Sequence, residues 1–229
     1  MTRRSPSDFE RVGIVAGLTA EARIARRLGG LVAVGGGTEA GARAAARRLV
    51  NQGVAALISF GLAGGLDPAL EAGALIVPDA VRVGGALVAT DPDLSRALGG
   101  PTVRCLLGAD AVASTAEEKQ RLWRETGCAA LDLESGVVAE VAGGHALAFA
   151  VLRAVCDPAA MSLPHAALSA LSMEGRIGLA RVFGAVAREP GQVPALLRLG
   201  RASVRARRTL ARQARRSSGP IRSWSRERS

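Results

Sequence analysis

Residues 129–157 read AALDLESGVVAEVAGGHALAFAVLRAVCD, two short apolar runs on either side of a helix-like segment. The first run ends in Asp132 and Glu134, and the second, residues 147–155, leads to Asp157. This pattern predicts a buried strand, a helix and a second strand. Where a crossover helix joins parallel strands, their carboxyl ends lie on one edge of the sheet, which is where such sheets bind ligands. We therefore expect these acidic side chains to meet.

The rest of the chain alternates strand-like and helix-like segments in the same way. This order predicts an α/β fold, one domain with a central, twisted, mainly parallel or mixed sheet flanked by helices. Residues 84–103 are expected to be a loop, and Thr19 is expected to cap a helix at 20–28. The other expected strands are 12–16, 31–34, 54–60, 74–83 and 103–107, and the other helices are 39–50, 116–126 and 164–188.

A length of 229 residues suits one full-sized α/β domain. We expect a disordered N-terminus at 1–10, one catalytic domain at 11–190 and a basic C-terminal tail at 191–229. The net charge is +10, and residues 196–229 carry eleven Arg against one Glu. The body is therefore neutral and the tail carries the whole excess.

No run of about 18 apolar residues is present, so no membrane-spanning helix is expected. The N-terminal MTRRSPSDFER has Arg residues without an apolar segment behind them, which argues against a signal peptide and for a cytoplasmic location. The three cysteines, Cys105, Cys128 and Cys156, are widely spaced within apolar runs. That spacing favours reduced, mostly buried thiols over a disulfide framework or a metal site.

Two glycine-rich segments, residues 35–37 and 61–65, follow predicted strands. Neither completes the dinucleotide or the Walker motif, because the required glycine spacing and the Gly-Lys-Ser/Thr ending are absent. A tight turn is the default interpretation of each. The segment 61–66 is read as a loop rich enough in glycine for the backbone to approach a ligand closely.

Four blocks of the sequence together resemble the nucleoside phosphorylase and nucleosidase superfamily, in that family's order and spacing over residues 12–188. Within it, the chain looks most like the hopanoid-associated phosphorylases, which are implied to remove adenine from adenosylhopane. This narrower resemblance depends on GLAGGLDP at 61–68, on DLES at 132–135, and on Asp-Pro at 157–158 with Leu-Pro at 163–164. The four superfamily blocks are GIVAGLTAE at 13–21, SFGLAGGL at 59–66, LDLES at 131–135 and VLRAVCD at 151–157.

Cleavage of an N-glycosidic bond leaves negative charge on the purine and positive charge on the ribose, so the enzyme protonates the base and holds the sugar. The resemblance implies that Asp157 is the acid near purine N7, that Glu134 accepts hydrogen bonds from the ribose 2′- and 3′-hydroxyls, and that Glu21 positions an attacking water. Each of these three residues also has a purely structural interpretation. Asp157 is also placed to cap a helix begun by Pro158, Glu134 suits a helix N-terminus, and Glu21 fits a solvated helix residue.

Three positions depart from the superfamily pattern. Leu133 stands where nucleosidases usually have a Met against the ribose, a change of similar volume. Leu62 stands where many relatives have a Ser that binds phosphate or the catalytic water, and Val112 replaces the aromatic residue that stacks on the base. These changes imply a weaker phosphate site and a looser base slot, so hydrolysis and phosphorolysis both stay open.

The remaining site residues have supporting roles. Arg153 lies inside an apolar strand and is expected to pair with a carboxylate, because a buried charge usually has a partner. Asp132 and Gly61 belong to the matching blocks and are assigned to the substrate site with it. No cofactor is expected, although inorganic phosphate is a possible co-substrate. No metal site is expected either, since His145 and His165 lie in no cluster of ligand-type residues.

The basic segment 196–216 places its apolar residues on one side of a helical wheel and most of its Arg residues on the other. This pattern is typical of a helix lying in a membrane interface, and it predicts peripheral contact with the inner face of the cell membrane. A solvated or partly disordered arm is the alternative.

Other functions use the same residues. A methylthioadenosine or S-adenosylhomocysteine nucleosidase needs the same Asp and Glu side chains. A non-catalytic relative that binds nucleosides or nucleic acid is the other alternative. The joint presence of Asp157, Glu134 and Glu21, and the lack of aromatics in the basic part of the tail, argue against it, so no nucleic-acid partner is expected. The resemblance also implies a homodimer or a larger homo-oligomer.

Overall fold

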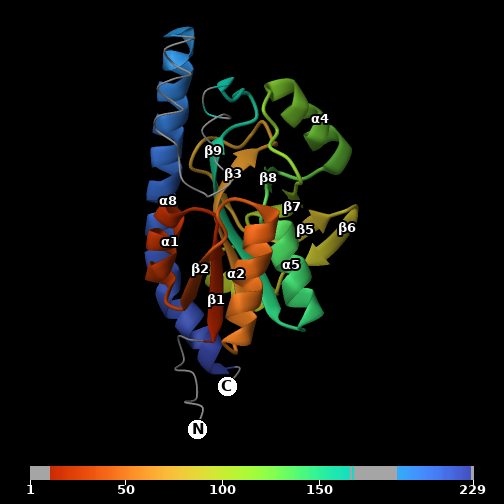
Figure 1. Cartoon of the computed structure of the whole chain (residues 1–229), viewed down its shortest axis with the longest axis vertical. Helices are drawn as coiled ribbons and strands as arrows, with labels where there is room; N and C mark the ends of the chain where they lie inside the picture. Colours follow the sequence, from red (N-terminus) through yellow and green to blue (C-terminus); the bar gives the residue numbers. More distant parts are fainter. Residues whose placement is uncertain (1–10, 166, 168–189, 228–229) are drawn as a thin grey trace.

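Two long strands, β3 (Ala56–Gly65) and β9 (Ala148–Asp157), lie side by side and parallel at the centre of the structure (Figure 1). The structure is a computed structural model that describes residues 11–165, 167 and 190–227. Nearly every side chain of both strands is buried. This burial explains their continuous apolar sequences, which strands covered on both faces require.

Within the part of the chain that the structure describes, the other strands extend this centre into one nine-stranded sheet. β1 runs parallel to both β3 and β2, while β8, β7 and β5 run parallel to one another on the other part of the sheet. β6 pairs antiparallel with β5, and β4 with β9. The expected mixed, mostly parallel sheet is therefore confirmed. The bounds are β1 Val12–Ala16, β2 Leu31–Val34, β4 Leu75–Ile76, β5 Pro78–Val83, β6 Ala86–Ala89, β7 Val103–Gly108 and β8 Ala130–Asp132.

The expected parallel relation of the strands on either side of residues 135–144 is wrong. β8 pairs antiparallel with the end of β3, whereas β9 pairs parallel with β3 along most of its length. Their acidic ends still meet, because Gly64 of β3 lies opposite Leu131 of β8 and also opposite Asp157 of β9. The long strand β3 thus joins the two halves of the site.

Helices cover both faces of the sheet (Figure 1). α2 and α5 pack together over β1, β2, β3 and β9 and form one apolar core with them. α1, the short 3-10 turn η1, α3 and α8 form a second core on the opposite face, where α8 packs along β9. The bounds are α1 Thr19–Ala25, η1 Arg26–Leu28, α2 Glu39–Asn51, α3 Pro92–Ala97, α4 Ala116–Thr126, α5 Ser135–Gly144, η2 Pro190–Gln192 and α8 Val193–Glu227.

Local sequence signals set most helix ends correctly. Thr115 caps α4 by accepting the backbone N–H of Glu118, and Gly127 ends that helix in the left-handed conformation. The predicted Thr19 cap is wrong. The N-cap of α1 is Leu18, whose backbone N–H donates to the carboxylate of Glu21.

Two segments expected as loops are regular structure. Residues 84–103 contain β6, which returns from β5 through the Gly84–Gly85 turn, and α3, which Asp91 caps. The glycine-rich segment 61–65 is the second half of strand β3. Its glycines reflect close approach by neighbouring groups rather than a turn. The expected helix at 164–188 and the expected disordered residues 1–10 lie almost entirely outside the described residues.

The basic segment at the C-terminal end forms one long helix, α8, that packs on the body of the domain. Ala206, Leu210 and Ala214 are fully buried in the second core. This part of the apolar face is therefore not available to a membrane, and the expectation that it lies in the interface is corrected. Leu197 and Val204, exposed by 55% and 46%, remain on the outside. Among the described residues, no helix combines the length and apolarity that a membrane span requires.

Candidate active site

A cavity of about 530 Å³ opens where β1, β3, β8 and β9 end and where α8 passes. Four carboxylates line it, from Glu21, Asp132, Glu134 and Asp157, together with the guanidinium of Arg153. Each of these five residues is less than a tenth exposed. The cavity also takes in three further predicted positions, Leu62, Leu133 and Val112.

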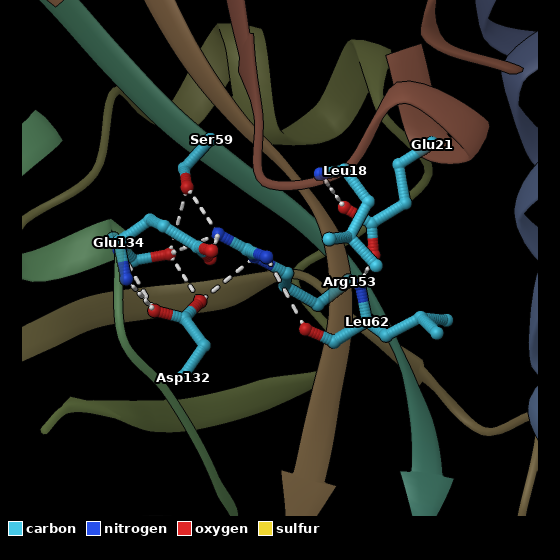
Figure 2. A network of polar contacts seen from close by, with 8 residues as sticks. Leu18, Glu21, Ser59, Leu62, Asp132, Glu134 and Arg153 are labelled. Carbon is cyan, nitrogen blue, oxygen red and sulfur yellow. Dashed lines mark hydrogen bonds and ion pairs between the residues drawn. The ribbon is translucent and has the colours of Figure 1, made fainter. Parts of the chain in front are cut away.

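Arg153 occupies the centre of a polar network on the floor of this site (Figure 2). Its Nε lies 2.7 Å from Asp132 Oδ2, and its Nη2 lies 2.9 Å from Glu134 Oε2. Nη2 also donates to Ser59 Oγ at 2.7 Å, and Nη1 donates to the carbonyl of Leu62 at 3.2 Å. Arg153 was expected to pair with one carboxylate, and it pairs with two, those of Asp132 and Glu134. The guanidinium fixes the positions of both carboxylates.

Asp132 has no oxygen left for a substrate. Oδ1 accepts the backbone N–H groups of Glu134 and Ser135 at 3.0 and 2.7 Å, and Oδ2 faces Arg153 and the Ser135 hydroxyl. Because these N–H groups begin α5, Asp132 satisfies donors that the helix itself leaves free. Its role is to build the site, although it lines the cavity.

Glu134 is the N-cap residue of α5 and lines the cavity, where its carboxylate lies beside Arg153 and Gly17. Burial raises the pKa of its carboxyl from 4.5 to about 7, although the charge of Arg153 opposes this shift. The neighbouring carboxylates of Asp132 and Glu21 raise it further. Glu134 is therefore a hydrogen-bond acceptor whose charge changes near neutral pH.

Glu21 is buried, so the interpretation of a solvated helix residue is wrong. Its two oxygens accept backbone N–H groups from Leu18, at 2.9 Å, and Leu62, at 3.1 Å (Figure 2). Desolvation raises the pKa of Glu21, while Arg153 and Arg207 act in the opposite direction. The carboxylate is held in one orientation beside the cavity, and its raised pKa makes it a stronger base.

Two glycines make this crowding possible. Gly61 does not line the cavity; a Cβ there would lie 2.6 Å from Arg153 Nη1 and 2.8 Å from Glu21 Oε2. Gly17 stands against the carboxylate of Glu134 in the same way. Only glycine leaves room for the charged groups at these positions.

Asp157 is paired with a group that sequence analysis did not identify. Lys119 Nζ, on α4, donates to Asp157 Oδ2 at 2.7 Å, and the thiol of Cys156 donates to Oδ1 at 2.9 Å. No described helix begins at Pro158, so Asp157 is not the helix cap of the alternative interpretation. Gly64 allows this approach, since a Cβ there would meet Asp157 Oδ2 at 3.1 Å.

The opposite wall of the cavity is largely apolar and comes from α8. Leu196, Leu199 and Val204 line it, with Ser203 and Arg207. Arg207, unlike most arginines of this helix, lies on the side that faces the cavity, close enough to act on the charge of Glu21. The cavity therefore has a carboxylate-rich end and an apolar end.

Comparison with known families agrees with this geometry. Residues 23–183 match the family model described as the phosphorylase superfamily, which is more than half of the chain. The chain belongs to the phosphorylase superfamily. The expected superfamily is thereby confirmed, and with it an enzyme of the nucleoside phosphorylase or nucleosidase type. No curated protein matches the sequence significantly.

Solved structures of low sequence identity share the fold of this superfamily member. The 5′-methylthioadenosine/S-adenosylhomocysteine nucleosidase of Neisseria meningitidis, in complex with methylthio-immucillin-A, superimposes with a TM-score of 0.67 at 15% identity, covering 92% of this chain and 99% of the other. The corresponding Helicobacter pylori nucleosidase gives 0.63 at 14%, covering 96% and 99%. Futalosine hydrolase of Helicobacter pylori gives 0.62 at 14%, covering 96% and 98%.

The four carboxylates that line the cavity were all predicted from the sequence, but most residues that hold them were not. Lys119 lies within an ordinary polar helix pattern, and Ser59 lies within an apolar strand. Gly17 and the α8 wall also went unassigned to the site. Its being the single Lys in a chain rich in Arg is a sequence signal that could have drawn attention to Lys119.

Proposed function

We propose that this enzyme cleaves the N-glycosidic bond of a 5′-substituted adenine nucleoside, with adenosylhopane as its substrate, and releases adenine. The observation that carries the proposal is the division of the cavity into a carboxylate-rich end and an apolar end. A purine and a ribose suit the first, and an apolar 5′-substituent suits the second. The structurally similar nucleosidases are named for 5′-methylthioadenosine and S-adenosylhomocysteine, which both contain adenine, and this supports adenine as the base.

The residues divide the chemistry among them. Asp157 gives a proton to the leaving purine, which neutralises the charge that develops on the base. Glu134 accepts the ribose 2′- and 3′-hydroxyls, since a carboxylate offers two acceptors to neighbouring hydroxyls. The negative charge of Glu134 also favours the positive charge that develops on the sugar. Leu133 and Val112 contact the sugar and the base through apolar surfaces.

Water is the proposed acceptor of the ribosyl group. A bound phosphate needs several donors, yet the backbone N–H groups of Leu18 and Leu62 are both taken by Glu21. Leu62 also brings no hydroxyl. Glu21 itself, with its raised pKa, is suited to orient a water and accept its proton. Phosphate remains the alternative co-substrate, and its donor would be Arg207.

Methylthioadenosine or S-adenosylhomocysteine is the second candidate substrate, because the same carboxylates serve it. The apolar wall of Leu196, Leu199 and Val204 is the observation that favours a larger apolar 5′-group. The names of the similar solved structures favour the smaller substrates. Relative kcat/KM values for the two classes decide between them.

We also propose that α8 holds the enzyme at the inner surface of the cell membrane. The outer face of α8, outside the cavity lining, exposes Leu197 together with Arg201, Arg205 and Arg208. Arginines near an anionic surface each contribute about 1 kcal/mol. A lipid-linked nucleoside would reach the apolar wall of the cavity from that side. The homodimer or larger homo-oligomer that the resemblance implies is a separate prediction, which light scattering tests.

The decisive experiment is product analysis with purified protein. Adenosylhopane and methylthioadenosine are each incubated with and without phosphate, and adenine and the ribosyl product are quantified. We expect adenine and a free ribosyl product, formed equally well without phosphate, with adenosylhopane preferred. A 1-phosphorylated product that scales with phosphate would establish phosphorolysis instead. Absence of adenine from both substrates would overturn the proposed function.

A further inference from the structure

Lys119 is the only lysine in the sequence, and every other residue among its 30 basic side chains is Arg. Its side chain is fully buried, at 0% exposure, which is unusual for an ammonium group. A buried charge is tolerated only where it is paired and hydrogen-bonded. The contacts of Lys119 therefore indicate what this one lysine does.

Among the described residues, the four hydrogen-bond acceptors of Lys119 all belong to the segment 157–161, which begins at the last residue of β9. Nζ donates to Asp157 Oδ2 at 2.7 Å and to the Asp157 carbonyl at 3.0 Å. It also donates to the carbonyls of Met161, at 2.9 Å, and Pro158, at 3.2 Å. One ammonium thus ties the carboxylate of Asp157 and the turn at 157–161 to α4.

The chemistry of this cluster explains why lysine is present. An ammonium is a compact point charge with three rotatable donors, so it fits a cage of oxygens that converge from several directions. A guanidinium is a planar fork and suits paired carboxylate oxygens, as Arg153 shows with its own partners. An arginine at position 119 would be too large and of the wrong shape for the cage.

We propose that Lys119 is a positioning residue for Asp157: it holds Oδ2, leaves Oδ1 to face the purine, and stabilises the charge that Asp157 acquires when it gives up its proton. This inference rests on the proposed role of Asp157 as the acid. Burial raises the pKa of the neighbouring Cys156 thiol well above 9, so this thiol stays protonated and adds no negative charge beside Oδ1, which lies 2.9 Å from its Sγ.

In the step itself, the proton leaves Asp157 Oδ1 and forms the N7–H bond of the purine. The electron pair of the N-glycosidic bond passes to the purine N9 and adenine leaves neutral, while C1′ of the ribose forms a bond to the water oxygen and Glu21 takes up the proton of that water. Asp157 becomes a carboxylate beside the Lys119 ammonium, which is already in place. Preorganised charge of this kind lowers the barrier because nothing reorients during the reaction.

A set of four variants tests the coupling between the two residues: K119M, D157N, the double variant K119M/D157N, and R96M as a control on an exposed ion pair. We expect K119M to lower kcat for adenine release about 10²-fold with little change in KM. D157N should lower it by about 10²–10⁴-fold. The double variant should match D157N, since Lys119 acts through Asp157, and R96M should match the wild type.

A second measurement needs no variant that might unfold. Because the chain has one lysine, labelling with ¹⁵N-lysine gives a single side-chain ammonium signal in an NMR spectrum. We expect this signal to be protected from exchange with water and to shift when adenine binds.

Three results separate the possibilities. Wild-type kcat in K119M, or a double variant slowed by the product of the two single losses, would overturn the role of Lys119. Adenine binding seen by calorimetry without a shift of the ammonium signal would also overturn it, even if K119M does not fold. Wild-type kcat in D157N would instead overturn the proposed role of Asp157.

Discussion

The guanidinium of Arg153 lies 2.9 Å from the carboxylate of Glu134, yet the pKa of Glu134 is about 7. Burial outweighs the attraction of the cation, because one guanidinium also serves Asp132 and lies near Glu21. Three carboxylates, those of Asp132, Glu134 and Glu21, therefore share the one guanidinium of Arg153. A positively charged ribosyl transition state would be stabilised by these carboxylates, because it supplies a second positive charge beside them.

The raised pKa of Glu134 predicts a pH dependence of stability. Its folded pKa of about 7 exceeds the ordinary 4.5, so the folded chain binds this proton more tightly than the unfolded chain. The free energy of unfolding should therefore be highest below pH 4.5 as far as this group is concerned, and should fall as pH rises from about 4.5 to about 7. Glu21 contributes with the same sign. Urea unfolding of wild type and E134Q across this range isolates Glu134, and parallel pH curves for the two would refute the assignment.

Removal of Arg153 should destabilise the fold. R153M leaves the buried carboxylates of Asp132 and Glu134 without their cation, and loss of one partner from a buried ion pair costs about 3–5 kcal/mol. S59A removes only one acceptor of Arg153, and about 1–3 kcal/mol is expected. Chemical denaturation measures both, with R96M as the exposed control. A loss for R153M no larger than for R96M would contradict the network described here.

A pair of glycine substitutions tests the crowding around the carboxylates. G61A places a methyl group 2.6 Å from Arg153 Nη1, and overpacking of this kind costs about 1–3 kcal/mol. Adenine release should fall with it. G143A, in α5, meets no atom within 4 Å and should be neutral or stabilising by up to about 1 kcal/mol. Thermal unfolding and adenine release measure the two variants, and equal behaviour would show that Gly61 has no special role.

The apolar wall predicts a change in substrate preference. L199N places an amide in the wall of the cavity, whereas L197N changes a neighbouring residue that points outward and is 55% exposed. We expect L199N to raise KM for an adenine nucleoside with a long apolar 5′-group about tenfold or more, and to leave adenosine less affected. L197N should leave both KM values unchanged. If L199N changes KM equally for both substrates, the 5′-group does not bind against the α8 wall.

The outer face of α8 provides the membrane test. Truncation before α8 would remove Ala206, Leu210 and Ala214 from the core and expose apolar surface, so a surface variant is the better probe. L197E/R201E, at two exposed positions outside the cavity lining, should reduce sedimentation with phosphatidylglycerol vesicles at low salt while adenine release from methylthioadenosine persists. R96M is the control for charge. Negligible vesicle binding by the wild-type chain would rule out the membrane contact.

Local sequence signals determined much of the secondary structure. Thr115 and Gly127 set the ends of α4 through hydrogen bonds and backbone conformation within a few residues, and the apolar run of β9 needs no partner to be recognised. The matching blocks likewise indicated Asp157, Glu134 and Glu21 before any geometry was known. Such signals act over short distances along the chain, which is why they can be read from it.

Tertiary contacts decided what those residues face. Lys119 meets Asp157 across 38 positions of sequence, and Arg153 meets Ser59 across 94. Gly61 looked like a turn because its reason for being glycine, the Arg153 side chain, comes from another strand. The same holds for α8, whose amphipathic pattern fits a membrane as well as a protein core. An apolar helix face gains free energy on either surface, and only the packing of Ala206 and Leu210 against the sheet determines which one this face covers.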